Sequence, residues 1–150
     1  MFSIFKNKSK LSDLIPEGFT DIHSHILLGI DDGAINIGET IELLSHLNTI
    51  GFSKCIFTPH TLPEIWDNTS GGITETFQNT KLQLANPLDC MLHHAASEYM
   101  INEAALQRLE TEKLLALKDN YLLIEMSYLN SPLALKEIIF ETQLKDTNPF

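Results

Sequence analysis

Apolar and polar positions along the chain follow two alternating spacings. Short apolar runs, typical of buried strands, occupy residues 19–26, 53–58, 90–96 and 121–126. Longer stretches with apolar residues three or four positions apart, typical of amphipathic helices, occupy residues 37–50, 73–85, 101–110 and 132–144. Strands that alternate with helices in this way favour an α/β fold with a parallel sheet.

Turn-forming residues separate these elements. Asp31-Asp32-Gly33 follows the first predicted strand, a long polar loop spans residues 61–72, and residues 146–149 (Asp-Thr-Asn-Pro) are typical of a turn. Residues 1–18 lie before the first strand and are expected to form an N-terminal extension. Residues 19–150 are expected to form the folded domain.

Composition and charge narrow the class of protein. The 150 residues are 43% hydrophobic and 20% charged, which is an ordinary globular composition. Ten basic against twenty acidic residues give a net charge of −10, which argues against sequence-independent nucleic-acid binding. The sequence has no apolar run of 18 residues, so no transmembrane segment is expected. Cys55 and Cys90 both lie in apolar stretches and are predicted to be buried thiols of a cytoplasmic protein.

Residue types that bind metal ions come at the end of each predicted strand. His23 and His25 end the first, and alternation along a strand would turn both side chains to one face. His60, Glu98 and Glu125 end the second, third and fourth. Functional groups gather at the C-terminal ends of parallel strands in α/β folds, so we expect these imidazoles and carboxylates to form a cation site.

Other candidates stay open at this level. Asp31 and Asp32 suit a turn before a helix, and either carboxylate could instead face a further metal ion. His93 and His94 lie within the third predicted strand, where we expect one to face the interior and the other a packed helix. Trp66 could form an aromatic wall beside a substrate or simply cover a loop.

Four segments together resemble a known family. Residues 21–33, with the sequence DIHSHILLGIDDG, are similar to the first motif of the polymerase and histidinol phosphatase (PHP) superfamily. Within it they most resemble the bacterial tyrosine-protein phosphatases of capsule and exopolysaccharide systems. Residues 58–60, 96–99 and 123–127 resemble the later motifs, and their order and spacing agree from Leu11 to the C-terminus.

This resemblance implies a fold, an activity and a ligand set. The fold would be a distorted (β/α)7 TIM-like barrel that holds up to three metal ions, most commonly Mn²⁺. The activity would be hydrolysis of phosphotyrosine on a protein, such as a polysaccharide-export tyrosine kinase, by metal-activated water and without a cysteine nucleophile. Carried over by position, the ligands would be His23 and His25 for the first metal, Glu98 between the first and second, Glu125 for the second, and Asp32 and His60 for the third. No catalytic residue is separable from these ligands, and the resemblance assigns no substrate-binding residue.

The resemblance also bears on length. Relatives continue with a His-Pro-Glu-Arg-type segment and an Asp-x-His pair that complete the metal site, and this sequence ends at Phe150 before both. We therefore expect a C-terminally truncated domain of about four βα units, since a closed barrel needs on the order of 200–250 residues. Two alternatives follow: a catalytically inactive remnant that binds metal or a partner protein, or a PHP-type phosphoesterase acting on small molecules.

Overall fold

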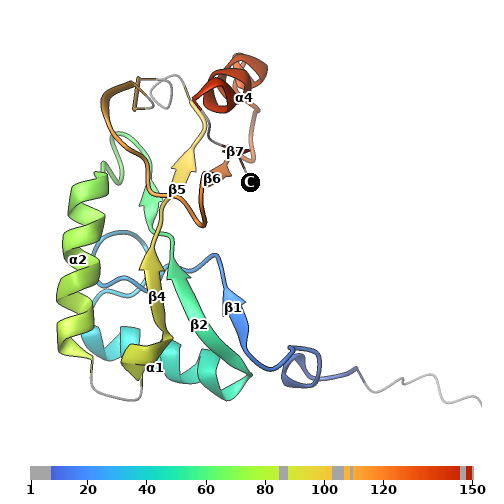
Figure 1. The fold of residues 1–150 in the computed structure, drawn as a ribbon, viewed down its shortest axis with the longest axis vertical. Coiled ribbons are helices and arrows are strands. Elements are labelled where there is room, and N and C mark those ends of the chain that lie inside the picture. The colour runs from blue at the N-terminus through green and yellow to red at the C-terminus, as the bar shows by residue number, and fades with distance from the viewer. Residues whose placement is uncertain (1–7, 85–87, 103–106, 109, 146–147, 150) are drawn as a thin grey trace, which may run out of the picture.

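The protein has an α/β fold with parallel strands in two short sheets (Figure 1). The computed structural model describes residues 8–84, 88–102, 107–108, 110–145 and 148–149. The first sheet has the order β1-β2-β4, with β1 at Phe19–Asp21, β2 at Phe52–Phe57 and β4 at Leu92–Ala95. The second has the order β3-β5-β6-β7, with β3 at His60–Thr61, β5 at Glu98–Met100, β6 at Tyr121–Glu125 and β7 at Asn148–Pro149.

The two sheets follow one another along the same chain segments. β2 passes into β3, and β4 passes into β5, after breaks of two residues (Figure 1). Hydrogen bonds bridge the breaks, because the Ala96 amide donates to the Phe57 carbonyl (2.8 Å) and the Glu98 amide to the Pro59 carbonyl (3.0 Å). The sequence predicted one parallel sheet. Pro59 has no N–H to donate to a ladder, which accounts for the interruption there.

Three helices are fully described: α1 (Ile37–Thr49), α2 (Ser70–Gln83) and α4 (Leu135–Leu144). Two 3₁₀ turns, η1 (Leu11–Asp13) and η2 (Leu88–Met91), accompany them. The side chain of Asn36 accepts from the Glu39 amide at the start of α1, and that of Thr69 accepts from the Gly72 amide at the start of α2. Capping by Thr69 explains why α2 begins three residues before the predicted position.

The main core lies between α1, α2 and the first sheet. Leu44 of α1, Phe77 of α2 and Phe57 of β2 belong to one buried cluster. The rings of Phe57 and Phe77 meet edge to face with centroids 5.6 Å apart. Burial of each such side chain stabilises the fold by about 1.5–3 kcal/mol, so this cluster anchors the strands from which the polar loops extend.

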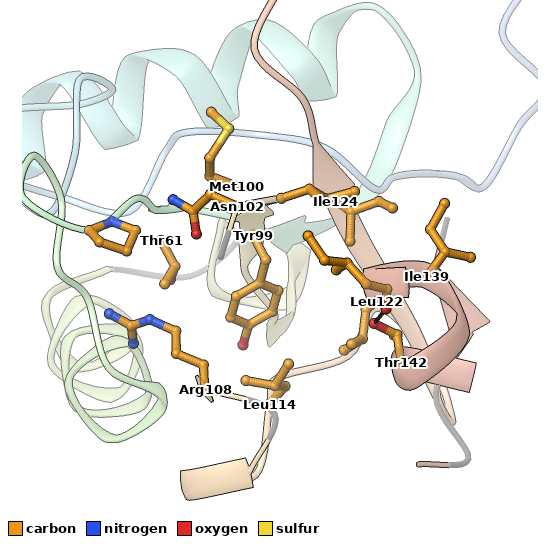
Figure 2. A pocket seen from close by; sticks show the side chains of 13 residues that line it. Thr61, Tyr99, Met100, Asn102, Arg108, Leu114, Leu122, Ile124, Ile139 and Thr142 are labelled. Atoms are coloured by element: carbon orange, nitrogen blue, oxygen red, sulfur yellow. Dashed lines mark hydrogen bonds between the residues drawn. The ribbon is translucent and has the colours of Figure 1, made fainter. Parts of the chain in front are cut away.

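A second packing region lies under α4. Tyr99 of β5 and Leu122 of β6 line an apolar cavity of about 30 Å³, together with Ile139 and Thr142 of α4 (Figure 2). The Tyr99 hydroxyl accepts from the Leu115 amide at 2.8 Å. Because side chains alternate along a strand, Glu98, which precedes Tyr99, turns to the other face.

Several sequence predictions need correction. The first strand stops at Asp21 instead of reaching residue 26, and the third begins at Leu92 after the turn η2. The predicted turn at residues 146–149 contains the strand β7, of which Asn148 pairs with Tyr121; residues 146 and 147 lie outside the described part. The final helix begins at Leu135, after Pro132 rather than at it.

Two further predictions have mixed outcomes. Cys55 is buried as predicted, and Cys90 is exposed in η2, so the prediction of two buried thiols was wrong for Cys90. Of the predicted helix at residues 101–110, positions 107, 108 and 110 are helical, and positions 103–106 and 109 lie outside the described residues. No helix among the described residues is both long enough and apolar enough to cross a bilayer.

Candidate metal centre

The loop after β1 carries two histidines of the centre, His23 and His25. Ser24, between them, is buried against β2: its amide donates to the Thr58 hydroxyl (2.9 Å) and its hydroxyl to the Ile56 carbonyl (3.1 Å). His23 and His25 flank this anchor and reach the same space, with their Nε2 atoms 3.4 Å apart. The sequence predicted this convergence from strand alternation, but an irregular segment fixed by Ser24 produces it.

The turn at residues 31–33 folds back against His25. The Ala34 amide donates to the His25 carbonyl at 3.1 Å. A Cβ atom added at Gly33 would lie 1.8 Å from that same carbonyl oxygen, a distance no side chain tolerates. Glycine is therefore required at position 33 for the turn to reach His25.

The second sheet supplies three further donor residues. His60 opens β3 and is the register partner of Glu98, which opens β5. Glu125 ends β6. The His60 Nδ1 atom lies 3.2 Å from Glu98 Oε2 and 2.9 Å from Glu125 Oε1. Trp66 stacks on the His60 ring with centroids 4.9 Å apart and an interplanar angle of 12°, so it limits rotation of this imidazole.

Glu98 is the centre of the arrangement. Its side chain is 7% exposed, and its carboxylate faces His23 Nε2 at 3.1 Å and His25 Nε2 at 3.3 Å, in addition to His60. On the outer side, Asp32 is exposed, and its Oδ1 lies 3.7 Å from His60 Nε2. His60 can thus present one ring nitrogen to Glu98 and Glu125 and the other to Asp32.

Three groups of side chains that could hold a metal ion result from this geometry. Within each group the potential ligand atoms lie within 4.8 Å of one another. The groups are His23, His25 and Glu98; His25, Asp32 and His60; and His60, Glu98 and Glu125. All six residues expected from the sequence are therefore brought together in one cluster.

The charges of the centre depend strongly on one another. Hydrogen bonding to Asp31 and then to Glu98 raises the pKa of His25 to about 10. Burial tends to raise the pKa of Glu98, but hydrogen bonding from His25 and the charge of His23 outweigh it, so the pKa is lowered. Burial and the neighbouring charge of Glu98 raise the pKa of Glu125. Without a cation, the two carboxylates therefore repel each other.

A divalent cation fits these residues. His60 Nδ1 and Glu125 Oε1 are buried side-chain atoms that make no hydrogen bond within the described part of the chain. Buried polar atoms normally have partners, and an ion held by these two adjacent atoms together with Glu98 would satisfy both. Imidazole nitrogens and carboxylate oxygens are ligands of Mn²⁺, Fe²⁺ and Zn²⁺, and the donor types alone do not select one of them.

Other residues singled out in the sequence have different surroundings. His93 is exposed and His94 half-buried, and both line a cavity of about 460 Å³ with Ile56 and Lys118 rather than joining the metal-binding groups. The prediction that one of the two faces the interior and the other a helix is therefore wrong for His93. From the turn pattern alone, Asp31 and Asp32 were equal candidates to face a metal ion. In the structure Asp31 has a fully buried carboxylate beside His25. The Asp-Asp-Gly pattern contains no signal that separates the two.

The fold and the centre together define a class: an α/β protein with parallel strands and overlapping groups of side chains that could hold metal ions. The chain belongs to the family described as "Capsular polysaccharide synthesis, CpsB/CapC", which it matches over residues 19–149. It is 30% identical over 131 residues to the tyrosine-protein phosphatase YwqE of Bacillus subtilis, covering 86% of this chain and 51% of that protein.

Two further comparisons agree. The chain is 29% identical over 108 residues to the tyrosine-protein phosphatase CpsB of Streptococcus pneumoniae, which covers 71% of this chain and 44% of that one. A solved structure from "Crystal structures of YwqE from Bacillus subtilis and CpsB from Streptococcus pneumoniae, unique metal-dependent tyrosine phosphatases" matches with a TM-score of 0.76 at 30% identity, over 87% of this chain and 53% of that chain. The family is thus one of tyrosine-protein phosphatases, and this chain spans about half the length of the relatives it matches.

Proposed function

We propose that this chain carries the metal-binding part of a protein-tyrosine phosphatase. The observation that carries the proposal is the convergence of three overlapping His and carboxylate groups in a chain whose relatives are metal-dependent tyrosine phosphatases. The substrate in this proposal is phosphotyrosine on a protein, such as a tyrosine kinase of polysaccharide export. The cytoplasmic location expected from the sequence stays a prediction.

In this proposal the six residues are metal ligands. His23, His25 and Glu98 hold the first ion, and Glu98 and Glu125 hold the second. Asp32 and His60 hold the third, and His60 Nδ1 lies close enough to Glu98 and Glu125 to serve the second instead. Bound cations, for which we propose Mn²⁺, would supply Lewis-acid activation of water and neutralise phosphoryl oxygens.

The protein's own contribution is positioning. Burial against β2 fixes Ser24 and with it the two flanking imidazoles. Trp66 holds the plane of His60, and the side-chain amide of Asn68 donates to the backbone carbonyls of Ile30 (3.0 Å) and His60 (2.7 Å), which ties the two ligand loops together. Such a preorganised set of donors keeps geometry constant when a charged phosphate group arrives.

The proposal is tested by phosphate release from a phosphotyrosine peptide. The assay uses the 150-residue chain and the complete gene product that contains it, each with Mn²⁺ and with Mn²⁺ plus a chelator. We expect phosphate release that the chelator abolishes. His23→Ala should reduce the release by at least about 100-fold. His46→Ala, on the exposed face of α1, should leave the release unchanged. Absence of Mn²⁺-dependent release from the complete product would refute the proposal.

Two alternatives to this proposal make different predictions in the same assay. Because the chain covers about half of each relative, it could bind metal or a partner protein without catalysing hydrolysis. Mn²⁺ binding by the 150-residue chain with no release from any phosphate ester would favour this inactive form. Release from small phosphate esters but not from the phosphotyrosine peptide would instead indicate a small-molecule phosphoesterase.

A further inference from the structure

Asp31 has three hydrogen-bond donors around a carboxylate that solvent does not reach. Its side chain is 0% exposed. Oδ2 accepts from His25 Nδ1 at 2.7 Å and from the His60 amide at 3.0 Å, and Oδ1 accepts from the Gly33 amide at 3.0 Å. Both oxygens are therefore occupied by N–H groups of the protein.

This environment differs from that of its neighbour Asp32. Asp32 is exposed, and its carboxylate belongs to one of the three possible metal-binding groups. Asp31 belongs to none of those found among the described residues. A carboxylate whose oxygens both accept from N–H groups is better suited to hold ligands than to act as one.

We propose that Asp31 is the positioning residue of the metal centre, which holds His25 with its proton on Nδ1 so that the Nε2 lone pair faces the cation. This inference rests on the proposed function, in which His25 is a ligand. His25 Nε2 lies 3.3 Å from Glu98 Oε2 and 3.4 Å from His23 Nε2, so the nitrogen opposite Asp31 is the one that faces the donor group. Carboxylate–imidazole–metal chains of this kind fix both the tautomer and the ring orientation.

Asp31 also sets the position of a second imidazole. The same oxygen that accepts from His25 accepts from the backbone of His60, 29 residues further along the chain. The rings of His25 and His60 lie with centroids 4.4 Å apart. One carboxylate thus fixes the loop after β1 relative to the start of β3, and loss of its charge should disturb two of the proposed ligands at once.

An isosteric substitution can isolate this role. Asp31→Asn keeps the volume of the side chain but replaces one acceptor oxygen with an NH₂ group. All three partners of Asp31 are N–H donors, so in any orientation of the amide at least one of them meets another donor. The variant therefore breaks the hydrogen-bond pattern without opening a cavity.

The first measurement is the affinity of the 150-residue chain for Mn²⁺, by calorimetric titration. We expect Asp31→Asn to weaken binding by about 10- to 100-fold. Asp67→Asn, on an exposed carboxylate outside the centre, serves as the matched control and should leave the affinity unchanged. Affinities of Asp31→Asn and wild type within twofold of each other would overturn the inference.

The second measurement locates the proton on His25 with Zn²⁺, which is diamagnetic, in the site. Imidazole ¹⁵N spectra of the Zn²⁺-loaded wild type should show Nδ1 protonated and in slow exchange with water, with Nε2 coordinated. Asp31→Asn should accelerate that exchange or change the coordinating nitrogen, which a general loss of stability would not do.

This second test needs only the wild type if the variant does not fold, since a proton on Nε2 or fast exchange at Nδ1 would by itself overturn the inference. Neither measurement uses hydrolysis. Cation binding with the expected His25 signature but without phosphate release would uphold the role of Asp31 and contradict the proposed activity. A wild type that binds neither cation would overturn both.

Discussion

Two pairs of neighbouring histidines occur in this protein, and they have opposite surroundings. His23 and His25 have ring centroids 5.4 Å apart, and His93 and His94 have centroids 4.9 Å apart. The first pair faces the carboxylate of Glu98. The second pair lines a cavity with Lys118. Within the described part of the chain, the ring of His94 forms a hydrogen bond with a backbone oxygen, that of Ala116, at 3.2 Å.

The electrostatic consequences differ in sign. Hydrogen bonding to carboxylates raises the pKa of His25 to about 10. Partial loss of solvent around its ring, with smaller contributions from His94 and Lys54, lowers the pKa of the largely exposed His93. A pair of imidazoles close in sequence is therefore not enough to attract a cation. The carboxylates that other strands bring to the pair decide whether a positive charge is favoured there.

The largest effect should come from removing the carboxylate that the first pair faces. Glu98 belongs to two of the three possible metal-binding groups. We expect Glu98→Gln to lower Mn²⁺ affinity by about 100-fold or more, because the neutral amide neither balances the ion's charge nor bridges two groups. Calorimetric titration measures this. Glu42→Gln, on the exposed face of α1, should match wild type; equal losses in both variants would mean that the effect is not local.

A thermal-shift experiment compares the two pairs directly. Mn²⁺ at 100 times its Kd should stabilise the wild type by about 2.7 kcal/mol, and chelation should reverse the shift. For a chain of this size that corresponds to roughly 5–10 °C in Tm. We expect His23→Ala to lose most of the shift and the double variant His93→Ala/His94→Ala to keep it. A shift that is kept in His23→Ala and lost in the double variant would show that the second pair, and not the first, binds the cation.

A smaller effect should appear in the metal-free chain. Burial and the charge of Glu98 raise the pKa of Glu125, so its ionised form opposes folding at pH values above its ordinary pKa. Glu125→Gln removes this repulsion and should raise the unfolding free energy of the metal-free chain by up to about 1 kcal/mol at pH 7. The difference from wild type should shrink as the pH falls and Glu125 takes up a proton.

Chemical denaturation with and without Mn²⁺ checks this prediction. With Mn²⁺ present, the order should reverse, since the same substitution removes a proposed ligand. A variant that is less stable than wild type in both conditions would show that Glu125 supports the fold rather than opposing it.

The smallest effect concerns the second pair. Lys54 contributes to the lowered pKa of His93. Lys54→Glu reverses the nearby charge and should raise the pKa of His93, an effect limited by solvent screening on this exposed residue. Proton NMR titration of the histidine rings measures it. An unchanged pKa of His93 would argue against a charge effect from this position.

The sequence predicts the elements of this fold better than the way they are joined. Helix α1 and strand β2 agree with the predicted ranges within one residue at each end, because strong apolar periodicity and clear terminal residues define them. The division into two sheets was not predictable from periodicity. It depends on Pro59 and on bridging bonds such as that from Ala96 to Phe57, which join residues far apart in the sequence.

The site shows the same limit. The six expected residues do converge. His60 and Glu98 lie just beyond the C-terminal ends of the neighbouring parallel strands β2 and β4, and this much follows from the order of the elements. The buried role of Asp31 could not be foreseen, because adjacent aspartates in a turn look equivalent until the fold closes over one of them. The anchoring of Ser24 by Thr58 likewise depends on a contact across 34 residues.

The unequal environments of the two cysteines have a practical consequence for spectroscopy. Cys55 is fully buried, and burial raises the pKa of its thiol to about 12, so it should resist alkylation at neutral pH. Cys90 is exposed in η2, before β4. A maleimide nitroxide should therefore attach at one position of the unmodified chain. Broadening of the nitroxide signal by Mn²⁺ would measure how far the bound ion lies from that label.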